Sequence, residues 1–514
     1  MKRYLIALLS VALLFSACKK DDDDYQKAAD KNRPDSPERP DGPIIPQMSP
    51  LVQILDSAIY YTPESFFEVV ESYPMIEMLS SVSPTVNTVF KGMVSLSQRS
   101  NIRTLDSLFD ARVGRDAHGQ RQWATETYSF SYRSISSQGM PIILSGRVTF
   151  PNNTVRGVAH ELSTISLYGH MMYMQDSWSA TENVTIMSLR SMMNSAVIEP
   201  DFQGYGVDSL NRNPGLAGRT LGQQMLDCAM AALEIMRSRN VRLADDGYTT
   251  NWAISLSAIA SLGATRFYEL EASDELRRAL RLRSTFATEG PLDPMSNILY
   301  AAIDTTFNTP LDQYFSNFGA MYIPSKYGYD EEDFCADWMR TTMIPYGDTA
   351  YSYIYYKLHK LGRNSRDYRP AGYQQKSPAW NFAPDMLTPD GEYDMNSPKL
   401  KAFIDVFDNE TRWTTWTPTT NIYMGHCKDD DFQPYGTARK LFERLHAKAP
   451  NNVHWYEIPR PAGNTTMDLI AKLMSYSSST SGMTLHYVVS LLNMLYITNV
   501  ENPEEMVIYY PIVD

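Results

Sequence analysis

Short strand-like runs alternate with longer helical stretches from about residue 128 to residue 458, and this alternation limits the fold more than any other feature of the chain. A period-2 hairpin opens the pattern, with Tyr128, Phe130 and Tyr132 followed by the run 142–150. Short strand-like runs follow at 165–168, 196–199, 249–252, 284–287, 422–424 and 453–458, and helical periodicity fills 221–237 and 262–282. Because strands joined through helices pair in parallel, we expect an α/β fold with a mostly parallel central sheet and helices on both faces.

The interval between the strand-like runs is short everywhere except between residues 290 and 416. That stretch is dense in tyrosine, tryptophan and phenylalanine, which suit both a lid over an apolar or sugar-bearing ligand and the inner core of an inserted unit. We therefore predict a core formed by 125–290 and 417–514, with a helical cap inserted at 291–416. The segment 51–124 has a mixed pattern and carries no recognisable chemistry.

The first seventeen residues have the three regions of an export signal. Lys2 and Arg3 precede an apolar run from residue 5 to residue 15, and Ser16 and Ala17 stand directly before Cys18. The apolar run is shorter than the ~20 residues that span a bilayer. A pair of small residues before a cysteine resembles the lipobox of bacterial lipoproteins, in which cleavage leaves a lipidated cysteine at the N-terminus. We expect a signal peptide at 1–17 and a lipid on Cys18.

Residues 18–50 are predicted to form a tether between that lipid and the folded part. Four aspartates, Asp21 to Asp24, follow the cysteine, and six prolines then recur between residues 34 and 50, which favours an extended polyproline strut. An acidic patch at this place resembles the surface-export signal of lipoproteins in some Gram-negative lineages. The expected location is the bacterial cell envelope, at the outer membrane and exposed on the surface.

Charge and cysteine content exclude several classes of function. Lys plus Arg number 46 against 59 Asp plus Glu, a net charge of −13, and nucleic-acid binding needs clustered basic residues. The four cysteines are scattered and form no CxxC or other zinc spacing. We expect no nucleic-acid partner, no metal and no cofactor.

Four segments in chain order resemble a secreted bacterial branch of the α/β-hydrolase superfamily, close to the secretory lipases and esterases. The first is 167–171, Leu-Tyr-Gly-His-Met, where the family has a His-Gly turn whose backbone N–H helps to form the oxyanion hole. The resemblance assigns that role to Met171, because the donor is a backbone group. The second is 199–206, Glu-Pro-Asp-Phe-Gln-Gly-Tyr-Gly, similar to the family's Pro-Asp-Tyr-x-Gly-Tyr-Gly. We expect Asp201 and the glycines of this turn to be structural.

The third segment, 251–260, stands where the family has its nucleophile elbow, Gly-x-Ser-x-Gly-Gly. No glycine is present, so the elbow is degenerate and two frames compete. Centring on Ser255 puts the small residues Ala253, Ser257 and Ala258 at the glycine positions, whereas centring on Ser257 puts β-branched Ile259 at one of them. We therefore favour Ser255 as the nucleophile, with Leu256 as the second backbone donor of the oxyanion hole, and keep Ser257 as the alternative.

The fourth segment, 416–435, resembles the family's acid segment, in which an aspartate four residues before a proline orients the catalytic histidine. That spacing before Pro434 selects Asp430. The histidine should stand at the head of the C-terminal helix, which makes His486 the candidate. The apolar pattern of that helix also permits an alignment in which Met483 replaces the histidine and His486 lies one turn further on.

The resemblance implies a serine ester hydrolase of the lipase and esterase type, acting on an ester or lipid-like small molecule. In that reading Ser255 attacks the carbonyl, His486 moves the proton and Asp430 orients the histidine. The alternative is a catalytically eroded lipoprotein on a hydrolase fold that binds lipid or glycan. The missing elbow glycines are the feature that favours this alternative.

Overall fold

The computed structural model describes the central sheet and the helices that follow its strands. The described residues are 50–56, 59–61, 125–136, 139–152, 159–170, 179–181, 188, 190–191, 194–208, 217–293, 396, 413, 415–427, 435–458 and 497. Of the regions expected from the sequence, the signal peptide, nearly all of the tether and the interior of the cap insertion lie outside these residues. Within the described part of the chain, no helix combines the length and the apolar character needed to cross a membrane.

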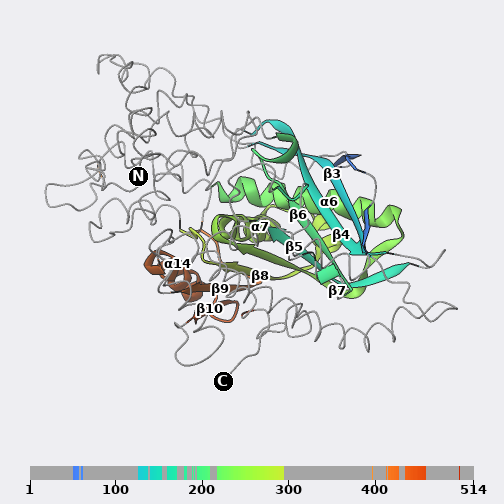
Figure 1. The fold of residues 1–514 in the computed structure, drawn as a ribbon. Helices are drawn as coiled ribbons and strands as arrows, with labels where there is room; N and C mark the ends of the chain where they lie inside the picture. The colour runs from blue at the N-terminus through green and yellow to red at the C-terminus, as the bar shows by residue number, and fades with distance from the viewer. Residues whose placement is uncertain are drawn as a thin grey trace, which may run out of the picture.

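Ten strands in the described residues form one sheet (Figure 1). The strand order is β1-β3-β4-β6-β5-β7-β8-β9-β10, with β2 also paired to β3. The bounds are β1 (Leu51–Ile54), β2 (Ile59–Tyr61), β3 (Thr125–Ile135), β4 (Pro141–Pro151), β5 (His160–Gly169), β6 (Ser195–Pro200), β7 (Val241–Ile254), β8 (Leu282–Thr288), β9 (Asn421–Cys427) and β10 (Val453–Ile458).

The pairing separates an antiparallel entry from a parallel body. β3 and β4 form an antiparallel hairpin, and β4 pairs antiparallel with β6. From β6 through β5, β7, β8 and β9 to β10, every neighbouring pair is parallel. All strand segments expected from the sequence lie inside these strands, so the predicted opening hairpin and mostly parallel sheet are confirmed. The sequence pattern did not indicate β1 and β2, which extend the edge of the sheet beyond β3.

Three long helices cover one face of the described sheet: α6 (Gly218–Ser238), α7 (Ala258–Leu270) and α14 (Tyr435–Lys448). The expectation of one helix over 262–282 was wrong. The chain breaks after α7 and forms a second short helix, α8 (Asp274–Leu280), before β8 begins. The Ser273 side chain accepts a hydrogen bond from the Leu276 N–H, and Arg281 takes a left-handed conformation. A new N-cap and a left-handed terminus divide the helix in a way that apolar periodicity does not reveal.

Alternate residues of β7 show that both faces of the sheet are covered. Asn251 points toward α7, because its Nδ2 donates to the Ser261 carbonyl at 2.9 Å. The next residue, Trp252, points to the opposite face, where the Arg190 guanidinium lies 4.3 Å from the centre of its ring. On that same face Trp252 begins a row of stacked rings across the strands, continued by Phe286, Tyr423 and His454 at spacings of 4.2, 5.0 and 5.1 Å.

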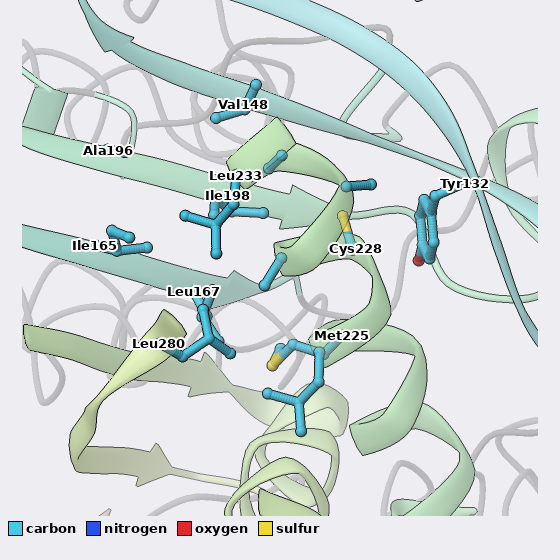
Figure 2. Close-up of a cluster of buried hydrophobic side chains, with 14 of the residues drawn as sticks. Tyr132, Val148, Ile165, Leu167, Ala196, Ile198, Met225, Cys228, Leu233 and Leu280 are labelled. Carbon is cyan, nitrogen blue, oxygen red and sulfur yellow. The ribbon is translucent and has the colours of Figure 1, made fainter. Parts of the chain in front are cut away.

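The core lies mainly between α6 and the middle strands. Met225, Cys228 and Leu233 of α6 meet Ile165 and Leu167 of β5 in the cluster that Figure 2 shows, and all five are buried. Aliphatic residues of β4 and β6 complete the same layer. This packing fixes α6 against the sheet and, through α6, the helix α7 that follows the candidate elbow.

The two ends of the long interval after β8 are tied to each other. The Trp413 indole N–H donates to the Leu292 carbonyl at 2.8 Å, although 121 residues separate them. Trp416 donates to the Glu269 carboxylate of α7 at 2.7 Å, and the backbone N–H groups of Thr419 and Thr420 donate to the same carboxylate. The chain therefore leaves and rejoins the core at one place, as an insertion between neighbouring strands requires.

Candidate active site

The strand-to-helix junction after β7 has the backbone that a nucleophile elbow needs. β7 ends at Ile254 with φ −127° and ψ 151°, and one turn of 3₁₀ helix, Ser255–Ser257, leads directly into α7. Ser255 has φ +57°, in the left-handed region that residues other than glycine rarely adopt. Such strain of about 1–3 kcal/mol persists only where the surrounding fold imposes it, and it concentrates at active sites. Ser255 is therefore the residue at which the chain turns.

Ser257 has an ordinary helical conformation and a different set of contacts. Its φ is −74° and its ψ is −8°. Its buried hydroxyl lies 2.7 Å from the Gly169 carbonyl and 3.0 Å from the Ile254 carbonyl, and can donate to either. A hydroxyl engaged with backbone oxygens in a relaxed helical turn does not have elbow geometry. The backbone therefore favours the frame centred on Ser255.

The turn expected to supply the oxyanion hole begins beside this elbow. Gly169, the last residue of β5, pairs with Ala253 of β7. His170 follows and is buried, with Nε2 3.0 Å from the Asp201 carbonyl and its ring 5.3 Å from the rings of both Phe202 and Tyr205. His170 thus joins the end of β5 to the turn that follows β6. Met171 lies outside the described residues, as does the side chain of Leu256, whose backbone is the middle of the elbow turn.

The turn after β6 is organised by the Asp201 carboxylate. It accepts hydrogen bonds from the Ser145 hydroxyl at 2.7 Å, the Thr181 hydroxyl at 2.7 Å and the Thr181 N–H at 3.2 Å. Gly204 and Gly206 both have positive φ, +89° and +57°. With three donors on one buried carboxylate, Asp201 has the contacts of a structural residue, in agreement with the sequence-based interpretation of this turn.

These features place the fold among known ones. A provisionally named hydrolase from Legionella pneumophila superposes with a TM-score of 0.51 and 13% identity, over 83% of this chain and 98% of that one. The rice cell wall degrading esterase LipA from Xanthomonas oryzae superposes with a TM-score of 0.51 and 14% identity, over 77% of this chain and 95% of that one. This chain has the α/β-hydrolase fold. No protein-family model matches the sequence, and no curated protein matches it significantly.

The hydrolase fold brings the carboxyl ends of β7, β8 and β9 to one edge of the sheet. β9 ends at Cys427, three residues before the predicted acid Asp430, which lies outside the described residues. The predicted histidine His486 and its alternative Met483 also lie outside them. The structure therefore describes the backbone of the candidate nucleophile and the strand that leads to the acid, while the assignment of the triad remains a prediction.

Two ionisable residues at this edge were not anticipated from the sequence. Glu289 directly follows β8, is fully buried and has φ +46°, and its N–H donates to the Gly425 carbonyl at 3.1 Å. His426, near the end of β9, follows Gly425, which pairs with Thr288, and its ring meets the Tyr435 ring edge-on with the ring centres 5.9 Å apart. The signal in the sequence that could have identified them is their position at the ends of predicted strands, where parallel sheets place functional groups.

A buried carboxyl on α6 has a strongly altered pKa. Burial raises the pKa of Asp227 to about 7, and a hydrogen bond from the Ser134 hydroxyl at 2.7 Å opposes that rise. One turn earlier on the same helix, Gln224 accepts from the Gln203 N–H and donates to the Ile135 carbonyl. This face of α6 thus joins β3 to the turn after β6 through polar contacts, and one of its side chains, Asp227, titrates near neutral pH.

Asp227→Asn is expected to remove a pH dependence of stability. Between pH 4 and 7 an unfolded Asp227 would lose its proton while the folded one keeps it, so the free energy of unfolding of the wild type falls as pH rises and then levels off. At 1.36 kcal/mol per pKa unit, the free energy of unfolding of the variant relative to that of the wild type should rise by roughly 3–4 kcal/mol between pH 4.5 and pH 8. Urea unfolding at both pH values measures this difference. Asp274→Asn, on the exposed face of α8, is the control. A variant with the wild-type pH profile would contradict the expectation.

Gly206→Ala is expected to destabilise the turn after β6 by about 2–4 kcal/mol. A Cβ at this position would lie 2.0 Å from the Ser145 hydroxyl and 2.4 Å from an Asp201 carboxylate oxygen, so the substitution adds steric conflict to the cost of a positive φ. Gly139→Ala is a matched control, because Gly139 has φ +80° and open space around its Cβ position. That variant should lose only about 1 kcal/mol. Chemical unfolding of both proteins gives the comparison, and equal losses would remove the steric argument.

Proposed function

We propose that this protein is a serine hydrolase of carboxylic esters, with lipid-like or other apolar esters as the substrate class. The observation that carries the proposal is the left-handed backbone of Ser255 at the junction of β7 and α7. Holding a serine in that conformation costs stability, and the resembled enzymes use the same turn to present a nucleophile. Esterase and hydrolase names among proteins of the same fold support this choice of chemistry.

In the proposed mechanism the Ser255 hydroxyl attacks the ester carbonyl while His486 accepts its proton. The tetrahedral oxyanion is stabilised by the backbone N–H groups of Met171 and Leu256, and Asp430 orients the histidine and supports its positive charge. The protonated histidine then gives its proton to the departing alcohol, and a water molecule releases the acyl group by the same steps. None of these steps needs a metal or a cofactor.

A panel of p-nitrophenyl esters with different acyl lengths tests the proposal, together with a fluorophosphonate probe analysed by peptide mapping. Hydrolysis with label on the 251–260 segment would support it. No hydrolysis and no label, in a folded protein that still binds an apolar ligand, would replace it by the alternative, an eroded hydrolase fold that captures lipid or glycan. The assay therefore separates an enzyme from a binding protein on one scaffold.

We also propose that the mature protein is held at the bacterial outer membrane, exposed on the surface, by a lipid on Cys18. The support is the order of charged, apolar and small residues before that cysteine and the acidic patch after it. A Cys18→Ala protein should move from the membrane fraction to the soluble fraction of fractionated cells, because the lipid is the expected anchor. Retention of that variant in washed membranes would argue against the anchor.

A further inference from the structure

The Ser257 hydroxyl connects the candidate elbow to the neighbouring strand β5. Its Oγ lies 2.7 Å from the Gly169 carbonyl, a contact between two buried groups 88 residues apart in the chain. The alternative acceptor, the Ile254 carbonyl, lies 3.0 Å away within the elbow itself. Because one hydroxyl has a single proton to donate, the shorter contact favours the bond that crosses from the elbow to β5.

Gly169 and Ser257 are also in close steric contact. A Cβ on Gly169 would lie 3.0 Å from the Ser257 Cβ and 2.9 Å from the Met225 Cε, so the end of β5 lies directly against the first turn of the elbow helix. His170, the residue after β5, is held by the contact of its ring with the Asp201 carbonyl. Gly169 and His170 are thus each held by a contact with another element, Gly169 by Ser257 and His170 by the turn after β6.

The position of the end of β5 relative to the elbow matters for the chemistry proposed above. Met171, the expected oxyanion donor, stands two residues after Gly169, and Leu256, the expected second donor, directly precedes Ser257. Both N–H groups must point at one oxygen atom, so the spacing between the end of β5 and the elbow sets the geometry of the hole. In the resembled elbow pattern this position is a glycine, which has no hydroxyl to make such a bond.

We propose that Ser257 is a positioning residue: its hydroxyl, bonded to the Gly169 carbonyl, holds the end of β5, which leads to the expected oxyanion donor, at its working distance from Ser255. The inference rests on the proposed function. It gives Ser257 a role in the site other than that of nucleophile, and it explains how an elbow without glycines keeps its register with the oxyanion strand. The residue acts through the backbone of its neighbours and does not touch the substrate.

Ser257→Ala tests the proposal, with Ser261→Ala as the matched control. Ser261 is buried one turn further along α7, and its hydroxyl donates to the Ala258 carbonyl at 2.9 Å, a bond that stays within the helix. Ser257→Ala should lower kcat for a p-nitrophenyl ester about tenfold with KM within twofold, since the oxyanion forms only in the transition state. The rate constant for fluorophosphonate labelling should fall by the same factor. Ser261→Ala should lose similar thermal stability and keep kcat within twofold.

Each outcome bears on the proposal. Equal kcat values in the two variants, or a change in KM alone, would overturn the positioning role and leave the proposed function intact. Absence of both hydrolysis and labelling in the wild type would reject the proposed function, and the positioning role with it. If Ser257→Ala fails to fold, Ser257→Cys takes its place, because a thiol keeps the volume but is a weak donor. The same drop in kcat is then expected.

Discussion

Ser255→Ala should abolish ester hydrolysis, lowering kcat by at least about 10⁴-fold, and should eliminate fluorophosphonate labelling. The expected size of the loss follows from the role of the residue, since without the nucleophile no acyl-enzyme can form. Folding should be unaffected, because alanine and serine share the same restriction at φ +57° and the side chains differ by one oxygen. Steady-state kinetics with a p-nitrophenyl ester measures the loss of kcat, and thermal unfolding tests whether folding is unchanged.

The position of the label decides between the two serines. In Ser257→Ala the probe should still attach to Ser255, at a lower rate. Label recovered on Ser257 in the wild type would show that the nucleophile stands two residues later, in a helical conformation with φ −74°. That result would contradict both the elbow assignment and the positioning role of Ser257.

The central sheet could be predicted from the sequence because its strands are buried on both faces. Short strand-like runs such as 165–168 and 284–287 recur along the chain, with helical segments such as 221–237 between them. The helix break at Ala272 and Ser273 could not be predicted in this way, because it depends on a side-chain cap and a left-handed residue and not on apolar period. β1 and β2 are too short to show a period of their own.

The candidate site could be proposed from the sequence only through the family resemblance. The choice between Ser255 and Ser257 as the centre of the elbow depended on the backbone conformation. Small residues surround both Ser255 and Ser257, so composition alone left two candidates. The φ of +57° at Ser255 and the Ser257 contact with Gly169 distinguish them, and neither is visible in a list of residues. Glu289 was not selected from the sequence, and only the fold reveals it as a buried carboxyl beside β9.

Replacing the predicted histidine is the second change with a large expected effect. His486→Ala should lower kcat by at least about 10³-fold at pH 7, because a serine hydroxyl without a base is a weak nucleophile and the leaving alcohol loses its proton donor. His454→Ala is the matched control. His454 lies within β10, half-buried, with its ring stacked on Tyr423 at 5.1 Å, and this packing role predicts a change in stability and not in kcat.

The alternative alignment of the C-terminal helix gives this experiment its second arm. If Met483 stands where the family has histidine, His486 lies one turn away and reaches the serine less directly, so Met483→His should raise kcat in the wild type and restore turnover to His486→Ala. If His486 is itself the base, Met483→His should neither raise kcat in the wild type nor restore turnover to His486→Ala. A His486→Ala protein with wild-type kcat would exclude both alignments and direct the search for the base to His426, which the fold places at the same edge of the sheet as Ser255.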